Sequence, residues 1–502
     1  MEGAGGHPCR HLHLAPVIAV IGLLTVPGGG GAEGGTGGSG TLADAASGLL
    51  VLYCLVRVVR SGARPLTRTA AVVLGLPVLG VCLAAITSND PAASLPGVAR
   101  YLQIFVLVPA AVVVLVRDRR DFTVLAWALV ALALLEGGVG VVQYLTGTGA
   151  SYMGEDVRAV GTFGPSDVMG MATVVAFGLV VAVGLALDGG TGRRAALVCA
   201  GLLVVPLVLS FSRGAWIATV LACAAQLVLS GVRRAVGVGL AVGALAVVLV
   251  GGFGIGSAMV KERVASITQV TAAPDQSVTD RYTMWAAAAG MWRTDPLTGV
   301  GLKGFPQYRD GHASLALSSG SDTAGAGQAF RRQPLLSPHN MYLLVLSEQG
   351  LLGVLALAGS WLALLAAAGR RLTRGTPGAL VAVGLLGWQL IDFAYADIGG
   401  PSTVLTAVVL GVAAWPALCG ADAHRVGSRP AGRWGSPLLE RSRELGGGWA
   451  HGTAPLRARS AHAPARTTGA TPLASAAPTG CGYEHEAEAP AGAPFRTGGR
   501  DA

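Results

Sequence analysis

Charged side chains are scarce in this sequence. Asp, Glu, Lys and Arg make up 13% of its 502 residues, whereas a soluble domain carries about 25%. Hydrophobic residues make up 52% and gather in long runs, and the mean hydropathy is +0.58. A deficit of charge together with long apolar runs excludes an ordinary soluble domain and is typical of chains that cross a membrane several times. We therefore expect an all-α, polytopic membrane protein.

The sequence also lacks the signatures of several function classes. Lysine occurs only at Lys261 and Lys303, and no basic run is interleaved with aromatic residues, so the net charge of +9 does not indicate a nucleic-acid partner. The 7 cysteines include no C-x-x-C pair and none lies in a predicted external loop, which argues against a disulfide framework and a metal site. Walker, H-E-x-x-H and G-x-S-x-G motifs are absent as well. We expect neither a metal nor a cofactor.

About twelve apolar segments approach or reach the length of about 20 residues that a membrane-spanning helix needs. The first segment is short, follows Arg10 and precedes a Gly-rich run, so a signal peptide is an alternative interpretation. Because no clear small-x-small cleavage site follows, we expect a helix there, and cleavage would leave the remaining topology unchanged. The segments are residues 14–27, 42–59, 69–87, 100–116, 122–145, 166–187, 195–211, 214–230, 235–257, 350–368, 378–396 and 402–419.

The distribution of arginine indicates the orientation of these segments. Alternate loops carry arginine clusters, and the positive-inside rule places such loops in the cytoplasm. An even number of spans then puts both termini in the cytoplasm and the opposite loops outside the cytoplasmic membrane. The clusters are Arg57, Arg60, Arg64 and Arg68; Arg117, Arg119 and Arg120; Arg193 and Arg194; Arg233 and Arg234; and Arg370, Arg371 and Arg374.

Four regions follow from this topology. Residues 1–257 hold the first nine helices, residues 258–338 form one large extracytoplasmic loop, and residues 339–419 hold the last three helices. Residues 420–502 are rich in Gly, Pro, Ala and Arg and show little apolar periodicity, so we expect a disordered cytoplasmic tail. A connection as long as the external loop is uncommon unless it has a function of its own.

The large loop contains a helical pattern. Arg281, Trp285 and Trp292 recur at helical spacing after Thr279-Asp280, which we expect to cap the helix. Asp295-Pro296 and the glycines that follow should end it.

Three external arginines are candidates for binding an anion. Arg213 follows Ser212, the expected cap of the eighth span, so an anion there would bind both the guanidinium and the free backbone amides. Arg281 belongs to the loop helix, and Arg158 stands before the sixth span. The alternatives are an arginine that reaches the membrane interface at 213, a surface ion pair with Asp280 at 281, and a solvated loop charge at 158.

A histidine lies at the start of the tenth span. With Ser337 as N-cap and Pro338 as the first helical residue, His339 would be the second residue of the helix, where the dipole disfavours imidazolium. A neutral imidazole can accept a proton, so His339 is a candidate general base. The alternative is a hydrogen-bonded histidine at a loop–helix junction. Asn340 either orients His339 or bonds to the local backbone.

Acidic residues within the spans are few. They are Glu136, Asp392 and, at a span edge, Asp397. Asp392, with Gln389 and Tyr395 nearby, supports an alternative interpretation as a membrane transporter. Glu348 stands at the boundary of an expected helix break, where we expect a structural role.

Several short motifs occur in order between residues 155 and 368, and together they resemble the O-antigen ligase and O-antigen polymerase superfamily. One departure is Pro165-Ser166-Asp167, where the family often has a Pro-Asn pair. The motifs are Phe211-Ser212-Arg213-Gly214-Ala215-Trp216, Arg281-Tyr282-x-x-Trp285, Pro296-Leu297-x-Gly299-Val300-Gly301-x-x-x-Phe305, Pro338-His339-Asn340-x-Tyr342 and Glu348-x-Gly350-Leu351-Leu352-Gly353.

The resemblance implies a metal-independent glycosyltransferase of polysaccharide biosynthesis in the cell envelope. Such proteins move a glycan from a polyprenyl diphosphate carrier to an acceptor hydroxyl on the outer face of the cytoplasmic membrane. The expected partners are therefore the lipid-linked donor, an unknown glycan, lipid or protein acceptor, and membrane lipids. By the resemblance, Arg213 and Arg281 would bind the diphosphate and His339 would be the catalytic histidine; the other substrate-binding candidates are Arg158, Ser212, Tyr282 and Asn340. A polymerase that joins repeat units is the alternative within the superfamily.

Overall fold

The computed structural model describes most of the chain before residue 420. Residues 420–502, predicted as a disordered tail, lie outside the described part, and so do residues 248–275 of the ninth predicted span and the large loop. The described residues are 8–26, 41–62, 65–88, 90–152, 155–163, 169–247, 276–318, 321–325, 331–333, 335–398 and 402–419.

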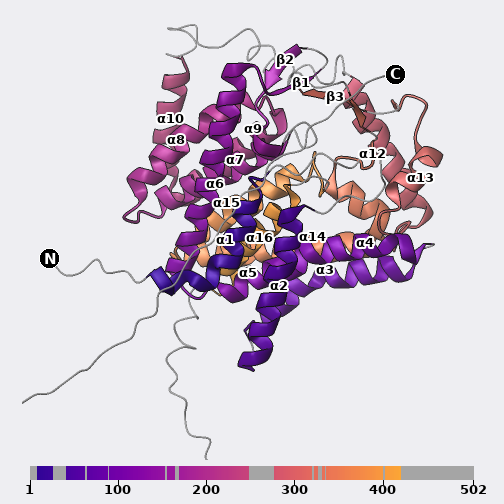
Figure 1. The fold of residues 1–502 in the computed structure, drawn as a ribbon, viewed down its shortest axis with the longest axis horizontal. Helices are drawn as coiled ribbons and strands as arrows, with labels where there is room; N and C mark the ends of the chain where they lie inside the picture. The colour runs from indigo at the N-terminus through magenta and orange to yellow at the C-terminus, as the bar shows by residue number, and fades with distance from the viewer. Residues whose placement is uncertain are drawn as a thin grey trace, which may run out of the picture. The chain divides into compact units, whose positions relative to one another are not determined.

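Helices account for most of the described residues (Figure 1). Helix α4, the π-helix η2 and helix α5 follow one another without a break. In chain order the helices are η1 (Pro8–Leu14), α1 (Ala15–Leu23), α2 (Leu42–Ser61), α3 (Arg68–Ile86), α4 (Pro91–Leu102), η2 (Gln103–Leu107), α5 (Val108–Leu115), α6 (Arg119–Thr146), η3 (Gly161–Phe163), α7 (Gly170–Leu187), α8 (Arg193–Leu209), α9 (Arg213–Ser230), α10 (Val232–Val247), α12 (Gln276–Thr294), α13 (Phe305–His312), α14 (Met341–Thr373), α15 (Ala379–Asp392) and α16 (Thr403–Leu418).

The chain is a polytopic membrane protein. Within the described residues, 7 helical segments are long and apolar enough to cross a membrane, namely α2, α3, the stretch Ser94–Leu115, α6, α7, α9 and α14. Shorter apolar helices cover His11–Leu23, α15 and α16. The predicted number of about twelve spans is larger. One reason is that helices such as α8, with 17 residues, are shorter than a full span; another is that the predicted span 235–257 lies partly outside the described residues.

The predicted helical membrane fold also carries a short sheet. A small antiparallel sheet, in the order β2-β1-β3-β4, joins two segments that are far apart in the chain. Its strands are β1 (Ala150–Tyr152), β2 (Glu155–Arg158), β3 (Ser321–Gly325) and β4 (Arg331–Gln333). Ala150 of β1 pairs with both Arg158 of β2 and Gly325 of β3. Strands of three to five residues are too short for an alternating pattern to be recognised in a sequence.

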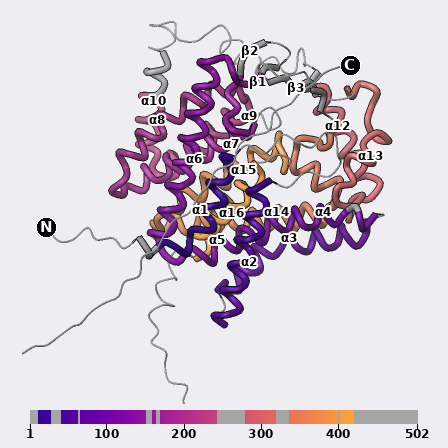
Figure 2. Tube along the Cα trace, in the orientation of Figure 1, coloured from indigo at the N-terminus to yellow at the C-terminus, as the bar shows by residue number. Residues whose placement is uncertain are grey.

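Small residues let the central helices pack closely. Helices α6, α7 and α8 lie side by side (Figure 2), and a Cβ atom added to Gly178 of α7 would lie 2.2 Å from the Cβ atom of Ala133 of α6. Helix α14 packs along α3, and α12 and α13 lie against α14. Close approach of helices at small residues is the usual packing within membranes, where apolar side chains gain little from leaving lipid.

The ends of the helices that carry the arginine clusters are joined by specific contacts. His11 Nδ1 and His13 Nε2 each lie 2.8 Å from a carboxylate oxygen of Asp121, near the start of α6. The backbone N–H of Gly378, before α15, donates to Asp188, after α7, at 2.6 Å. Arg371 donates to the carbonyl of Leu418 at 3.5 Å. These contacts join the start of α6 to the N-terminal segment, the end of α7 to the start of α15, and the end of α14 to the end of α16.

Helix α14 is broken at Gly350, which has φ 63° and ψ −165°. The chain before α13 crosses the break and replaces the lost helical hydrogen bonds. Four backbone bonds join the two segments: Val300 N to Ser347 O at 2.9 Å, Gly301 N to Glu348 O at 3.1 Å, Leu351 N to Pro296 O at 2.9 Å and Leu352 N to Leu297 O at 3.1 Å. A break in a membrane helix is tolerated where protein satisfies its backbone groups. The motifs around Pro296 and Glu348 are therefore the two sides of one backbone crossing.

Candidate functional site

The α8–α9 turn presents Arg213 as expected. Ser212 is the N-cap of α9, and its hydroxyl accepts a hydrogen bond from the backbone N–H of Ala215 at 3.3 Å. Phe211, just before the cap, has φ 49°, in the left-handed region that non-glycine residues seldom occupy. Arg213 is thus the first residue of α9, beside free backbone amides that suit an anion.

Arg158 is held beside the same turn. The backbone N–H of Ala159 donates to the carbonyl of Leu209, the last residue of α8, at 3.2 Å. Behind this segment, the buried Glu136 of α6 accepts from the backbone N–H and the hydroxyl of Thr162, at 2.9 and 2.8 Å. The intramembrane acid therefore serves a structural purpose, and Arg158 stands next to the start of α9.

Helix α12 carries Arg281 and binds two other parts of the site. Arg281 Nη1 donates to the carbonyl of Tyr395 at 3.2 Å, and Trp285 Nε1 donates to the carbonyl of Pro338 at 2.9 Å. Residues four apart share one face of a helix, which gives the Arg-x-x-x-Trp spacing a physical reason. The expected cap at Thr279-Asp280 is wrong, since α12 begins at Gln276.

The carboxylate of Asp280 accepts hydrogen bonds from the backbone N–H and the hydroxyl of Ser318, at 2.8 and 2.6 Å.

The start of α14 differs from the expectation. Asn340, not Ser337, is the N-cap, and its side-chain oxygen accepts from Leu343 N at 3.0 Å. His339 therefore precedes the helix, with φ 48°, and the helix-dipole argument for a neutral imidazole does not apply. Asn340 Nδ2 donates to Ala394 O at 2.8 Å, so its side chain bonds to backbone and does not orient His339.

The imidazole of His339 nevertheless favours its neutral form. The surrounding protein keeps water from the imidazole, and this desolvation lowers the pKa of His339 below its ordinary value of 6.5. The positive charge of Arg281 lowers the pKa of His339 further. Asp397 acts in the opposite direction, with a carboxylate oxygen 4.0 Å from His339 Nδ1. Asp397 is buried and accepts a hydrogen bond from the Ser337 hydroxyl, while 44% of the His339 side chain is exposed. The site thus holds a partly exposed base with a buried carboxylate behind it.

A short segment after α15 joins these parts. The carbonyls of residues 393–396 all accept hydrogen bonds: those of Phe393 and Ala396 from Met341 N, that of Ala394 from Asn340, and that of Tyr395 from Arg281. The ring of Tyr395 also lies against Gly214, directly after Arg213. The structure therefore brings the α8–α9 turn, α12 and the start of α14 to one place.

A comparison with family models identifies part of the chain. Residues 195–358 match the model described as O-antigen ligase. This stretch, about a third of the chain, is therefore similar to the O-antigen ligase family. The matched stretch begins in α8 and ends within α14. The comparison with curated proteins gives no match.

The similarity to this family carries a coarse statement of function. The O-antigen ligase family implies an enzyme that transfers glycans in polysaccharide biosynthesis and uses lipid-linked glycan substrates. Arg213, Arg281 and His339 all lie within the matched stretch, whereas Arg158 precedes it and Tyr395 and Asp397 follow it.

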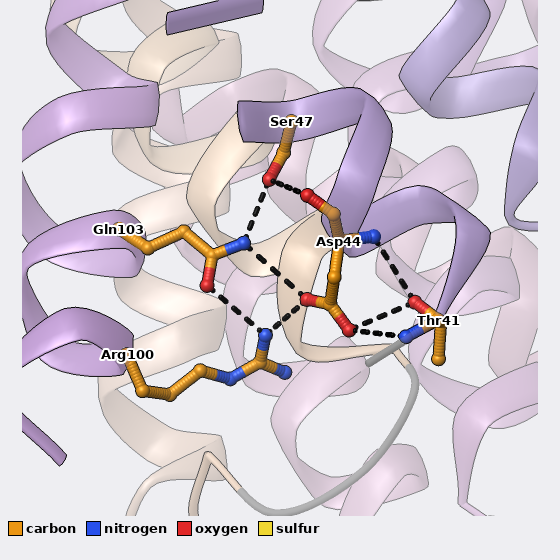
Figure 3. Close-up of polar contacts among 5 residues, drawn as sticks. All are labelled: Thr41, Asp44, Ser47, Arg100 and Gln103. Carbon is orange, nitrogen blue, oxygen red and sulfur yellow. Dashed lines mark hydrogen bonds and ion pairs between the residues drawn. The ribbon is translucent and has the colours of Figure 1, made fainter. Parts of the chain in front are cut away.

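Not every arginine predicted to lie on the outer side is a candidate. Arg100 of α4 donates to Asp44 of α2 and to Gln103 at 3.2 Å (Figure 3). Gln103 donates in turn to Ser47 at 2.7 Å, and Thr41 caps α2 through Asp44. This cluster ties α2 to α4, so Arg100 has a structural partner.

Tyr282, predicted to bind substrate, is 47% exposed, and its ring meets that of Trp285 edge-on at 5.6 Å. Among the described residues, no cluster of three or more His, Cys, Asp or Glu is placed to hold a metal ion.

The sequence analysis missed Asp397 as the partner of His339 and Tyr395 as a contact of Arg281. Both lie more than fifty positions beyond His339 in the chain, a separation no local pattern bridges. The available signal was the run of polar side chains Asp392, Tyr395 and Asp397 at the end of an otherwise apolar span. That run supported the transporter interpretation. In the structure, however, Asp392 is the last residue of α15, and this end of the helix is the one that lies next to the candidate site.

Proposed function

We propose that this protein transfers a glycan from a polyprenyl diphosphate carrier to an acceptor hydroxyl on the outer face of the cytoplasmic membrane. The observation that carries the proposal is the meeting of Arg281, His339 and Asp397 with the Arg213 turn around residues 393–397. The match of residues 195–358 to the O-antigen ligase model supports the same chemistry. Glycan transfer from a diphosphate requires positively charged side chains that bind the diphosphate and, beside them, a neutral base that accepts the proton of the acceptor.

In the proposed reaction, the acceptor oxygen attacks the anomeric carbon while the bond between that carbon and the diphosphate breaks. His339 takes the proton of the acceptor hydroxyl, and the resulting imidazolium is stabilised by Asp397 at ion-pair distance. Arg213 and Arg281 stabilise the negative charge that develops on the departing carrier diphosphate. Direct displacement inverts the configuration at the anomeric carbon.

The decisive experiment uses purified protein in vesicles, with a polyprenyl diphosphate-linked glycan and candidate acceptors. We expect the intact protein to form a glycosylated product, which mass spectrometry would identify and NMR would show to have inverted configuration. The acceptor found will also separate a ligase from a polymerase that joins repeat units.

Alanine variants test the proposed roles. Arg213→Ala, Arg281→Ala and His339→Ala should each abolish transfer while leaving the protein in the membrane. Arg293→Ala is a matched control, because Arg293 is exposed near the end of the same helix as Arg281 and should be dispensable. Wild-type transfer by His339→Ala would rule out the proposed base.

A further inference from the structure

Tyr395 contacts the structural parts that carry both arginines of the proposed site. Its carbonyl accepts a hydrogen bond from Arg281 Nη1 at 3.2 Å. Its ring occupies the space that the Cβ atom of a larger residue at position 214 would need. Such a Cβ atom would lie 2.1 Å from Tyr395 Cε2 and 2.4 Å from Tyr395 Cζ. One residue therefore contacts the guanidinium of Arg281 on one side and the first turn of α9 on the other.

The backbone of Tyr395 is itself fixed by its neighbours. Tyr395 N donates to Asp392 O at 3.0 Å, and the carbonyls of Ala394 and Ala396 are bound by Asn340 and Met341 at the start of α14. The ring consequently has little freedom to retreat from Gly214. A glycine at 214 is required by this contact, since Gly214 is a helical residue whose backbone has no left-handed φ.

The phenol oxygen of Tyr395 contributes less than the ring. It is buried and makes no standard hydrogen bond within the described residues. Burial and the neighbouring carboxylate of Asp392 raise the pKa of Tyr395 above its usual range, so the phenol stays neutral. The contact with Gly214 is therefore a matter of shape.

We propose that Tyr395 is a positioning residue that sets the separation of Arg213 and Arg281 for the two phosphates of the donor. This inference rests on the proposed function, and it concerns a residue beyond the matched stretch 195–358. A diphosphate presents two charged groups at a fixed separation, so the two guanidinium groups must match that separation when the glycosidic bond breaks. Misplacement of such groups by about 1 Å can lower a rate about 100-fold.

The test compares Tyr395→Ala, Tyr395→Phe and Gly214→Ala with the intact protein, using a polyprenyl diphosphate-linked glycan as donor. We expect Tyr395→Ala to lower kcat about 100-fold with a much smaller change in KM, since both arginines still attract the donor. Tyr395→Phe keeps the ring and should restore kcat. Gly201→Ala, in α8 with nothing within 4 Å, is the matched glycine control and should be silent.

Gly214→Ala should lower kcat because its new methyl group meets the ring. In the double variant Gly214→Ala/Tyr395→Ala the ring is gone, so kcat should be no lower than in Tyr395→Ala alone. Should Tyr395→Ala fail to fold, Tyr395→Leu gives the same comparison.

Wild-type kcat in a folded Tyr395→Ala or Tyr395→Leu protein would overturn the inference, as would a loss of activity in Tyr395→Phe equal to that of Tyr395→Ala. The proposed function is tested separately. Inactive Arg281→Ala and His339→Ala with an active Tyr395→Ala would refute only the positioning role, whereas activity in all three would refute the proposed function.

Discussion

At the scale of single residues, the site is characterised by side chains whose protonation and direction are set by their neighbours. His339 and Phe211 both have left-handed φ values, at 48° and 49°, and both stand directly before an N-cap residue. Non-glycine residues in this conformation cost about 1–3 kcal/mol and cluster at functional sites. At 339 this conformation belongs to the partly exposed residue that we propose as the base.

The pH dependence of transfer should report His339. Because its pKa lies below 6.5, the imidazole is neutral near neutral pH, and kcat/KM should fall as the pH drops through that pKa. Asp397 raises this pKa, so Asp397→Asn should shift the acidic limb of the profile to lower pH and reduce its maximum. Asp310→Asn, at an exposed carboxylate, should leave the profile unchanged. A shift of the limb to higher pH in Asp397→Asn would contradict the assignment.

Charge alone should not suffice at position 281. Arg281 binds the Tyr395 carbonyl through one nitrogen of a planar guanidinium group that carries five N–H donors, whereas lysine has a single ammonium group and cannot present a planar fork. We expect Arg281→Lys to lower kcat on the order of 100-fold, and Arg293→Lys on the same helix to have no effect. Steady-state rates with the lipid-linked donor measure both, and equal rates in the two variants would argue against a directional role for Arg281.

At the scale of elements, the break in α14 determines how the external segments are held. Gly350 and Gly299 face each other across the crossing: a Cβ atom on Gly350 would lie 2.3 Å from Leu297 C, and one on Gly299 would lie 2.5 Å from Glu348 C. Glu348 is buried at this crossing, and its carboxylate accepts from Phe305 N at 3.3 Å. The carboxylate thus caps the start of α13, in agreement with its expected structural role.

Gly350→Ala should be strongly destabilising. Its φ of 63° with ψ −165° belongs to a region open only to glycine, which costs other residues about 1–3 kcal/mol before the backbone clash is counted. Gly369→Ala lies in the same helix with nothing within 4 Å and should be neutral or slightly stabilising. The free energy of unfolding of the two variants in the same detergent would compare them, and equal stability would show that the break does not depend on Gly350.

Sequence patterns predicted the elements better than the way they meet. Within the described residues, every predicted apolar segment overlaps a helix because hydrophobic length is a local property. The cap at Ser212 was equally local and is confirmed. The cap at Ser337 was wrong because the carbonyls of residues 393–396, far along the chain, bind Asn340 and Met341 and fix where α14 begins. Local signals cannot report such tertiary contacts, which also determine the partners of Arg281 and His339.

At the scale of the whole chain, the helix ends fall into two groups. One end holds Arg158, Arg213, Arg281 and His339, and the other holds the arginine clusters near Asp121, Asp188 and Leu418. The positive-inside rule assigns the second group to the cytoplasm. By the same rule we predict that the first group, with the candidate site, lies outside the cytoplasm.

Cysteine labelling would test this orientation. In a background with native cysteines replaced by serine, Leu315→Cys, at a fully exposed position after α13, should react with a membrane-impermeant maleimide in intact cells. Thr373→Cys, exposed at the end of α14, should react only after permeabilisation. The opposite pattern would place the candidate site in the cytoplasm and remove the proposed donor from its reach.

The small sheet has a consequence for engineering acceptor choice. Because β1 pairs with both β2 and β3, the stretch before the sixth predicted span and the stretch before the tenth form one hydrogen-bonded unit. Consider a chimera that takes β3 and β4 from a relative but keeps its own β1 and β2. The pairing register of the imported β3 need not match β1, so backbone groups along β1 would lose their hydrogen-bond partners. Grafts intended to alter what receives the glycan should exchange both stretches together.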